Sequence, residues 1–172
     1  MQSNFQKIIE FHKAFGLQHK DEPQMNVFED KKLIDLRVSL IQEEVNELKD
    51  AIKDKDFTEV IDALGDILYG VYGSGSSFGI DLDKAFDLIH KSNMTKLCKS
   101  EEEAIQTVEW YKENETRYDT PAYRLSDDKK YYVVYNESTG KILKSINYKP
   151  VKFDSIFSRT QNFVEETFTI FA

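Results

Sequence analysis

Three glutamates stand close together in a stretch whose apolar residues recur at helical spacing. Glu43, Glu44 and Glu47 lie within a helix predicted from about Glu29 to Lys53. With about 100° of rotation per residue, Glu47 falls roughly 40° and Glu44 roughly 100° from Glu43 around the helix axis. The same sector holds the apolar residues Leu33, Leu36, Leu40 and Ala51. The polar residues lie on the other side of Glu43: Lys32, Asp35, Ser39, Gln42, Asn46, Lys49, Asp50 and Lys53. The three carboxylates are therefore predicted to face the apolar side of the helix.

A second acidic stripe follows on the next predicted helix. Asp62 and Asp66 lie one turn apart, and Glu59 lies beside them. Asp56 together with Glu59 gives the start signal of this helix. The helix runs through VIDALGDILYGVYGSGSSFG and is apolar on nearly every other side, so it is expected to be buried. We therefore expect two acidic stripes to meet in a packing interface.

Carboxylates that share a buried interface need compensation. Burial and mutual repulsion raise their pKa values and cost several kcal/mol unless a positive group balances them. A divalent cation is the simplest such group, and ligands that are all oxygen favour magnesium, calcium or manganese. The competing interpretation is an ordinary charged helix surface, which would explain a lone ExxE pair. Two stripes on apolar faces favour the metal site.

Other cofactor and catalytic patterns are absent from the sequence. An EF-hand loop is missing, and a di-iron helical site would require ExxH on two helices. None of the three histidines has a glutamate three residues earlier: His12, His19 and His90 are preceded there by Ile9, Gly16 and Asp87. No P-loop, Rossmann glycine pattern or GxSxG elbow occurs. The remaining chemistry is that of a hard divalent cation bound by carboxylates.

Two further helices complete the N-terminal part of the chain. Residues 3–15 have helical spacing, with Ser3 and Gln6 in a capping-box pattern. A polar loop follows, and a fourth helix is predicted through LDKAFDLIHKSNMTKL. Residues 1–97 are therefore predicted to form a helical domain that carries the candidate site, and residues 98–172 a C-terminal arm.

The arm is predicted to contain a short helix, a β-hairpin and an irregular tail. Ser100 and Glu103 form a second capping-box pattern before AIQTVEWYKEN, and the following NETRYDTPAYRLSDDKK has the composition of a loop. YYVVY and KILKSI flank NESTG, in which Gly140 supplies turn chemistry, so one hairpin is expected. From Asn147 to Ala172 the sequence is rich in phenylalanine and irregular.

Length and charge limit the partners. The chain has 172 residues, close to one domain of ordinary size, and 31 acidic against 23 basic residues give a net charge of −8. That balance disfavours long nucleic acids and anionic membranes, and an anionic ligand would need a cation or a local basic pocket. The single cysteine, Cys98, excludes an intramolecular disulfide and a four-cysteine zinc site. With neither a signal peptide nor a long apolar run, a cytoplasmic location is expected.

The motifs together resemble a known family. QEEVNEL, EVIDALGDILYGVYG and FGIDLDKAFDLIHKSNMTKL, with FHKAFG near the start and GKILKSINYKP near the end, are similar to segments of the MazG-like all-α nucleoside triphosphate pyrophosphohydrolases. That superfamily includes phosphoribosyl-ATP pyrophosphohydrolase and the dimeric dUTPases. The resemblance implies an all-α fold, in which a four-helix bundle is completed by dimerisation and the arm is appended. The chain is then expected to be a homodimer or a dimer of dimers.

The resemblance also implies roles for the acids. The family binds magnesium, with manganese as the alternative, through an EExxE motif followed by ExxD. The second half is ambiguous here because Ala63 stands where a glutamate is usual. Metal ligands are assigned to Glu43, Glu44, Glu47, Asp62 and Asp66, with Glu59 as the alternative to Asp62; catalytic roles are assigned to Glu44 and Glu47, and substrate contacts to Lys91, Asn93 and Lys96.

The activity implied by the resemblance is magnesium-dependent hydrolysis of a nucleoside triphosphate between its α and β phosphates, which gives the monophosphate and pyrophosphate. SNMTKL and the DALGD register are closest to the branch that acts on dUTP or another deoxynucleotide, in a house-cleaning role. Two alternatives stay open: a phosphoribosyl-ATP pyrophosphohydrolase, and a non-catalytic nucleotide-binding or dimerisation module of the same fold. Bound magnesium would reverse the local sign of the acidic stripes and admit a triphosphate.

Overall fold

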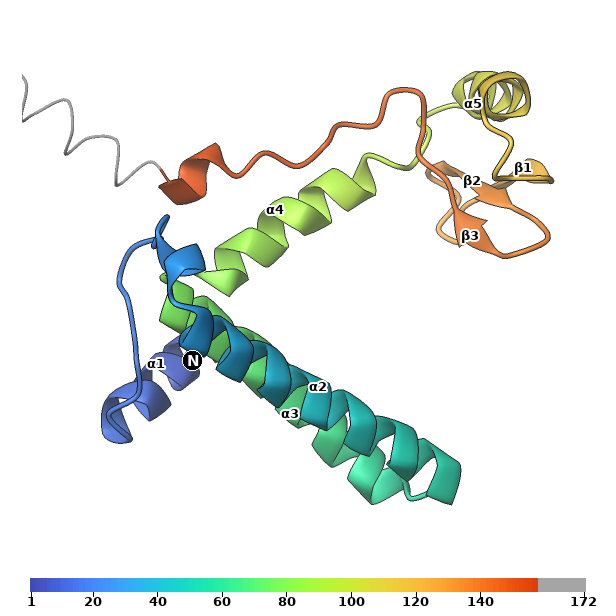
Figure 1. Cartoon of the computed structure of the whole chain (residues 1–172). Coiled ribbons are helices and arrows are strands. Elements are labelled where there is room, and N and C mark those ends of the chain that lie inside the picture. Colours follow the sequence, from blue (N-terminus) through green and yellow to red (C-terminus); the bar gives the residue numbers. More distant parts are fainter. Residues whose placement is uncertain (158–172) are drawn as a thin grey trace, which may run out of the picture. The chain divides into compact units, whose positions relative to one another are not determined.

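The computed structural model describes residues 1–157, which form six helices and a small sheet (Figure 1). The elements are α1 (Asn4–Ala14), a 3-10 helix η1 (Val27–Glu29), α2 (Lys31–Asp54), α3 (Phe57–Phe78), α4 (Leu82–Met94), α5 (Glu101–Asn114), β1 (Pro121–Leu125), β2 (Tyr132–Asn136) and β3 (Lys141–Ile142). The chain forms two compact units. Among the described residues, the helical unit is Met1–Ala85 together with 153–157, and the C-terminal unit is Phe86–Lys152. Helix α4 begins in the first unit and ends in the second.

Side-chain caps fix where the helices begin. Ser3 and Gln6 form the predicted capping box at α1: Gln6 N–H donates to Ser3 Oγ at 3.3 Å, and Ser3 N–H donates to Gln6 Oε1 at 2.9 Å. Asp30 and Asp56 accept hydrogen bonds from backbone N–H groups in the first turns of α2 and α3, and Ser100 does so for α5. The predicted helix starts are therefore confirmed to within two residues, because they depend on local hydrogen bonds that short motifs specify.

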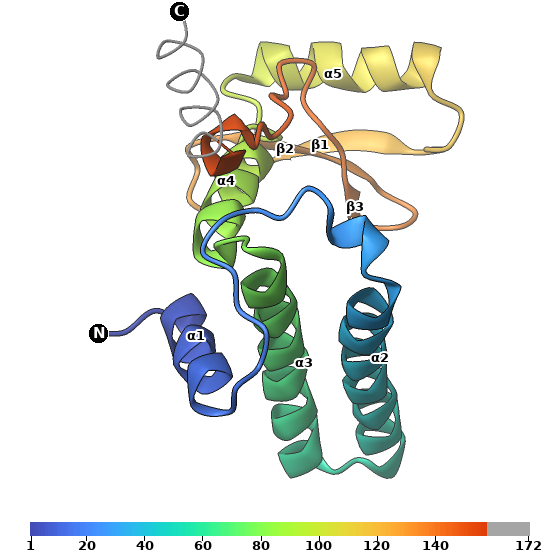
Figure 2. The same cartoon turned by 60° about the vertical axis from the view of Figure 1, so that its left-hand side comes forward.

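In the helical unit, α2 and α3 lie side by side as an antiparallel pair (Figures 1 and 2). Lys55, in the left-handed region at φ 58°, and Asp56 connect them. Helix α1 packs against α3. Gly79 ends α3 at φ 74°, where a Cβ would lie 1.8 Å from the carbonyl oxygen of Glu22, so only glycine fits. The loop before α2 therefore passes directly against the end of α3.

The apolar faces of this helix pair are largely uncovered in the single chain. On α3, Ile61, Leu64 and Leu68 are 60%, 49% and 56% exposed. The buried residues of α3 are small ones: Ala63, Gly73, Gly75, Ser76 and Ser77. The expectation that the third helix is buried is therefore wrong for the residues that the structure describes. Periodicity shows which side chains share a face, but it does not show what covers that face.

The C-terminal unit packs α5 against a three-stranded antiparallel sheet with the order β1-β2-β3 (Figure 2). Its core is formed by Cys98, Ala104, Val108, Tyr111, Val134 and Leu143. Strands β2 and β3 form the predicted hairpin, which turns at Gly140 with φ 69°. Strand β1 corrects the prediction of a loop in this segment. Pro121 begins that strand at an edge of the sheet, where a proline is tolerated because its missing N–H breaks no central ladder.

The predicted domain limits, 1–97 and 98–172, differ from those of the two compact units and stay a prediction. The predicted irregular tail, from Asn147, is irregular up to a single helical turn at 154–157, and its remainder lies outside the described residues. No helix within residues 1–157 combines the length and the apolar composition needed to cross a bilayer.

Candidate active site

The five predicted acids all belong to the helical unit. Glu43, Glu44 and Glu47 lie on α2, and Asp62 and Asp66 lie on α3. Glu44 is half-buried, whereas the other four are exposed. The prediction that these carboxylates all face inward is therefore wrong within the single chain. The reason is the same as for the apolar side chains of α3: their shared faces are uncovered.

Glu44 is the electrostatic centre of the acidic group. Burial raises the pKa of its carboxyl above the ordinary value of 4.5, and the charges of Glu47, Asp66, Glu43 and Asp62 raise it further. Its Oε2 atom is buried and has no hydrogen-bond partner among residues 1–157. The fold therefore brings the other four predicted carboxylates within electrostatic range of Glu44, and it leaves a buried oxygen at their centre without a partner.

A cavity of about 310 Å³ opens beside Glu44. Its lining combines acidic, basic and apolar side chains from three helices and one loop: Phe11 and His12 from α1; Leu17 from the loop after α1; Arg37, Leu40 and Glu44 from α2; and Asp66, Tyr69, Gly70 and Gly73 from α3. The rings of Phe11 and Tyr69 meet edge to face with 5.3 Å between their centroids. The cavity thus places carboxylates beside an apolar wall, as small-molecule sites commonly do.

Arg37 is a residue of this cavity that the sequence analysis did not identify. Its side chain is buried, and burial lowers the pKa of the guanidinium. Its Nε atom has no hydrogen-bond partner among the described residues. Arg37 lies seven residues before Glu44, close to two full turns, so the two share a face of α2. A charged residue at that spacing within the apolar sector is the signal that would have found it.

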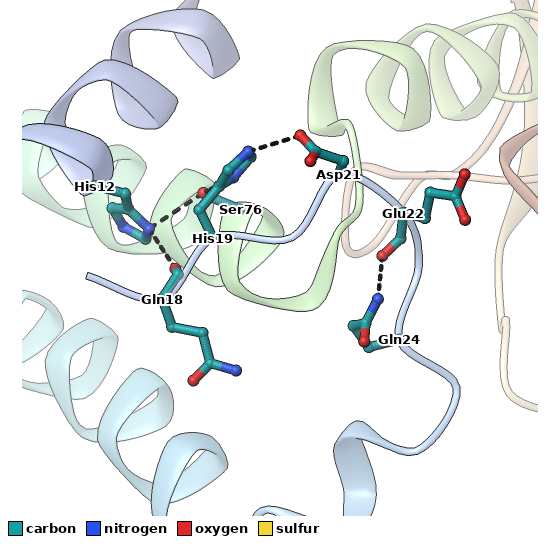
Figure 3. Close-up of polar contacts among 7 residues, drawn as sticks. All are labelled: His12, Gln18, His19, Asp21, Glu22, Gln24 and Ser76. Carbon is teal, nitrogen blue, oxygen red and sulfur yellow. Dashed lines mark hydrogen bonds and ion pairs between the residues drawn. The ribbon is translucent and has the colours of Figure 1, made fainter. Parts of the chain in front are cut away.

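His12 is anchored at the cavity by a chain of hydrogen bonds (Figure 3). Its Nδ1 lies 2.7 Å from the carbonyl oxygen of Gln18 and 3.1 Å from Ser76 Oγ. Nδ1 of His19 lies 3.0 Å from the same Ser76 hydroxyl, and its Nε2 lies 3.0 Å from the Asp21 carboxylate. A carbonyl oxygen only accepts, so Nδ1 of His12 carries the shared proton. Burial lowers the pKa of His12, which favours the neutral ring.

Two similarities to known proteins cover this region. Residues 8–93, which contain all five acids, match the family model of phosphoribosyl-ATP pyrophosphohydrolase. The chain belongs to this family. An uncharacterised protein of Acanthamoeba polyphaga mimivirus is 30% identical over 239 aligned residues, which cover 90% of this chain and 95% of that protein. The phosphoribosyl-ATP pyrophosphohydrolase family lies within the MazG-like superfamily, as the motifs indicated, and membership indicates a nucleotide pyrophosphohydrolase, a hydrolase of phosphoric anhydrides.

In a member of the phosphoribosyl-ATP pyrophosphohydrolase family, these carboxylates are the expected metal ligands. Among the described residues, no three His, Cys, Asp or Glu side chains lie close enough to hold a metal ion as they stand. The donor set nonetheless fits a hard divalent cation: Oε2 of Glu44 lacks a partner among the described residues, and four further carboxylates lie within electrostatic range of it. Those four side chains are exposed, so they are not held in place by packing.

The alternatives for the fourth ligand differ in position. Asp62 is among the carboxylates that raise the pKa of Glu44. Glu59 lies in the first turn of α3, where its backbone N–H donates to the capping carboxylate of Asp56 at 3.2 Å. This placement favours Asp62 as a neighbour of Glu44, and the ligand roles themselves stay predictions.

The predicted substrate contacts lie in the C-terminal unit. Lys91 and Asn93 are exposed near the end of α4, and Lys96 is half-buried just beyond it. Lys91 and Asn93 fall within the segment matched by the family model, whereas Lys96 lies outside it. Their contacts with phosphate or sugar stay predictions of the family resemblance.

Proposed function

We propose that this protein is a magnesium-dependent nucleoside triphosphate pyrophosphohydrolase that cleaves dUTP or another deoxynucleotide between its α and β phosphates. The products are the nucleoside monophosphate and pyrophosphate. The observation that carries the proposal is the half-buried Glu44 beside a cavity of about 310 Å³. Its Oε2 has no partner among the described residues, and four further carboxylates lie within electrostatic range. A hard divalent cation would satisfy that oxygen and offset the acids' repulsion.

The residues divide the chemistry between binding and proton transfer. Glu43, Glu44, Glu47, Asp62 and Asp66 would hold magnesium or manganese, which when bound neutralises phosphate charge. Glu44 or Glu47 accepts a proton from the attacking water. A raised pKa makes the carboxylate of Glu44 a stronger base than an ordinary glutamate. The water oxygen bonds to phosphorus while the P–O bond linking the α and β phosphates breaks, and pyrophosphate leaves.

A second copy of the chain is part of the proposal. Ile61, Leu64 and Leu68 on α3 and Leu36 on α2 are each about half exposed or more, beside the acids on the same helices. Burying them against another copy would remove apolar area from water and complete a bundle, as the family resemblance implies. Sedimentation across protein concentrations would show a homodimer or a dimer of dimers. A monomer at every concentration would contradict this arrangement.

Phosphoribosyl-ATP is the second candidate substrate. The match of residues 8–93 to the family model of phosphoribosyl-ATP pyrophosphohydrolase supports it. The cavity lining contains both an apolar wall and charged side chains, which suits either substrate class. An assay with both substrates is therefore needed to distinguish a deoxynucleotide pyrophosphohydrolase from a phosphoribosyl-ATP pyrophosphohydrolase.

The test is a panel of canonical, deoxy and damaged nucleoside triphosphates together with phosphoribosyl-ATP, with magnesium, manganese or a chelator. We expect turnover of at least one deoxynucleotide with magnesium and none with the chelator. Glu44→Gln should lower kcat by about 100-fold or more, because a positioned proton acceptor contributes at least that much. Asp35→Asn is the matched control, since Asp35 is exposed about 180° around α2 from Glu44, and it should keep full activity.

Two outcomes would contradict the proposal. Turnover of phosphoribosyl-ATP alone would establish the second candidate. Metal-dependent nucleotide binding without product would indicate a non-catalytic binding module that has kept the acidic stripes.

A further inference from the structure

Arg37 is a buried cation for which the described chain provides no anionic partner. The residue is 7% exposed, and its Nε is buried without a hydrogen bond to any residue that the structure describes. None of the ion pairs within residues 1–157 includes it. A buried charge without a counter-charge is strongly unfavourable, so one is expected from outside the described chain.

The nearest polar neighbour does not supply that charge. A Cβ placed on Gly73 would lie 3.1 Å from Arg37 Nη1 and 3.5 Å from His12 Nε2, so both nitrogens converge on this glycine. His12 Nδ1 already donates to the carbonyl of Gln18, so Nε2 of the neutral ring carries no proton. Histidine is neutral or positive and never an anion. The hydrogen-bond chain from His12 ends at Asp21, whose side chain is 91% exposed, so that carboxylate is solvated at the surface.

The carboxylates of the same cavity lie too far along the helices to pair with Arg37. Glu44 is seven residues away on α2, and at about 1.5 Å per residue this is roughly 10 Å along the axis. Asp66 is separated from Gly73 by the same number of residues on α3. Since both pairs line one cavity, the cavity has carboxylates toward one end and a buried cation toward the other. This arrangement suits a ligand with a bound metal ion, which would face the carboxylates, and a neighbouring anionic group, which would face Arg37.

We propose that Arg37 binds a phosphate oxygen of the substrate's polyphosphate chain, and that it holds pyrophosphate as this group leaves. The inference rests on the proposed function and adds to it a residue outside the acidic motifs. A neutral group such as a base edge would leave the buried charge without a counter-charge, whereas a phosphate balances it. Gly73 leaves space for the guanidinium of Arg37, because a side chain at this position would crowd it. His12 is a positioning residue, held by Gln18 and Ser76 beside Arg37.

The test measures binding of inorganic pyrophosphate with magnesium by calorimetry, with no nucleotide present. Arg37→Met keeps the length of the side chain and removes its charge, and it should weaken binding by about tenfold or more. Arg37→Lys should restore part of the affinity. Lys32→Met is the matched control, since Lys32 is an exposed cation on the same helix, and its affinity should equal that of the original chain.

The thermal midpoint separates binding from a structural role. Removing a buried unpaired charge should leave the midpoint of Arg37→Met unchanged or raised, whereas a structural arginine would lower it. If Arg37→Met does not fold, Gly73→Ala tests the same point, because its Cβ would lie 3.1 Å from Nη1 and shift the guanidinium by a few tenths of an ångström, which should also weaken pyrophosphate binding. Affinity within twofold of the original chain in a folded Arg37→Met or Gly73→Ala variant would overturn the inference, as would absence of pyrophosphate binding by the original chain.

These outcomes are separable from those of the proposed function. Hydrolysis with unchanged pyrophosphate affinity in Arg37→Met would reject the role of Arg37 and keep the enzyme. Pyrophosphate binding that depends on Arg37, without hydrolysis of any nucleotide, would support the anion site and reject the enzyme.

Discussion

The two units of the chain differ in how completely they satisfy their own buried groups. In the C-terminal unit, the side chain of Asn136 is 1% exposed and makes four hydrogen bonds to neighbouring groups. In the helical unit, Arg37 Nε and Glu44 Oε2 are buried without partners among residues 1–157, and both residues line one cavity. Buried polar groups are normally paired, so a pair of exceptions in one place indicates a site that is completed by something else.

The apolar side chains of the C-terminal core and of α3 also differ in how far they are buried. Val134 and Leu143 of the C-terminal unit are 0% and 2% exposed, packed in a core that the unit closes by itself. Ile61, Leu64 and Leu68 of α3 are about half exposed or more. The C-terminal unit thus encloses a small core of its own, whereas the apolar stripe of α3 in the helical unit is open in the single chain.

The largest expected effect concerns the closed core. Leu143→Ala should lower the free energy of unfolding by about 2–5 kcal/mol, because the substitution loses buried area and leaves a cavity. Leu64→Ala on α3 is the matched substitution at 49% exposure, and it should cost about 1 kcal/mol or less. Urea unfolding measures both, with the fluorescence of Trp110 in α5 reporting on the C-terminal unit and circular dichroism on the helices.

Equal costs for the two substitutions would break the comparison. They would mean that the face of α3 is covered in solution as fully as the core of the C-terminal unit. Repeating the Leu64→Ala measurement at several protein concentrations would then identify a second copy as the cover, because dimer stability depends on concentration.

Short sequence motifs predicted where the helices begin, whereas the cavity depends on contacts between helices that such motifs do not specify. Ser3 and Asp56 form caps whose hydrogen bonds span three residues, so the sequence specifies them directly. Periodicity also placed Glu44 on the correct face of α2. It did not reveal Arg37 as a buried cation, since its burial depends on contact with α1 and α3. Strand β1 was missed for a similar reason: its pairing with β2 is a tertiary contact, and Pro121 argued locally for a loop.

The second expected effect is an opposite response to pH in the two units. Burial, and then the neighbouring acids, raise the pKa of Glu44, so the folded state holds its proton more tightly than the unfolded state. Its ionisation therefore removes stability as the pH rises from the ordinary pKa of 4.5 through the raised folded value. Glu44→Gln should raise the thermal midpoint at pH 7 and leave it unchanged at pH 4. With magnesium at pH 7, the original chain should instead have the higher thermal midpoint, because the metal stabilises only the chain that keeps Glu44.

Glu103 provides the matched carboxylate in the C-terminal unit. Burial opposes its ionisation, but hydrogen bonds from Ser145 and from the backbone N–H of Lys99 outweigh burial and hold its pKa below 4.5. Its stabilisation is present above pH 4.5 and is lost as the pH falls through the lowered folded value. Glu103→Gln should lower the free energy of unfolding at pH 7 by about 1–2 kcal/mol. Shifts of the same sign for both variants would reject this contrast.

The smallest expected effect is a gain at Gly65, which lies between Asp62 and Asp66 on α3. A Cβ there meets no heavy atom within 4 Å, and alanine is favoured over glycine inside a helix by about 1 kcal/mol, so Gly65→Ala should stabilise the chain by about that amount. Gly75→Ala is the control in the same helix; its Cβ would lie 2.6 Å from Leu82 Cγ, so it should destabilise. Thermal unfolding measures both. If a second copy packs closely over Gly65, the gain becomes a loss at concentrations where the dimer forms, because the added methyl group then meets the partner.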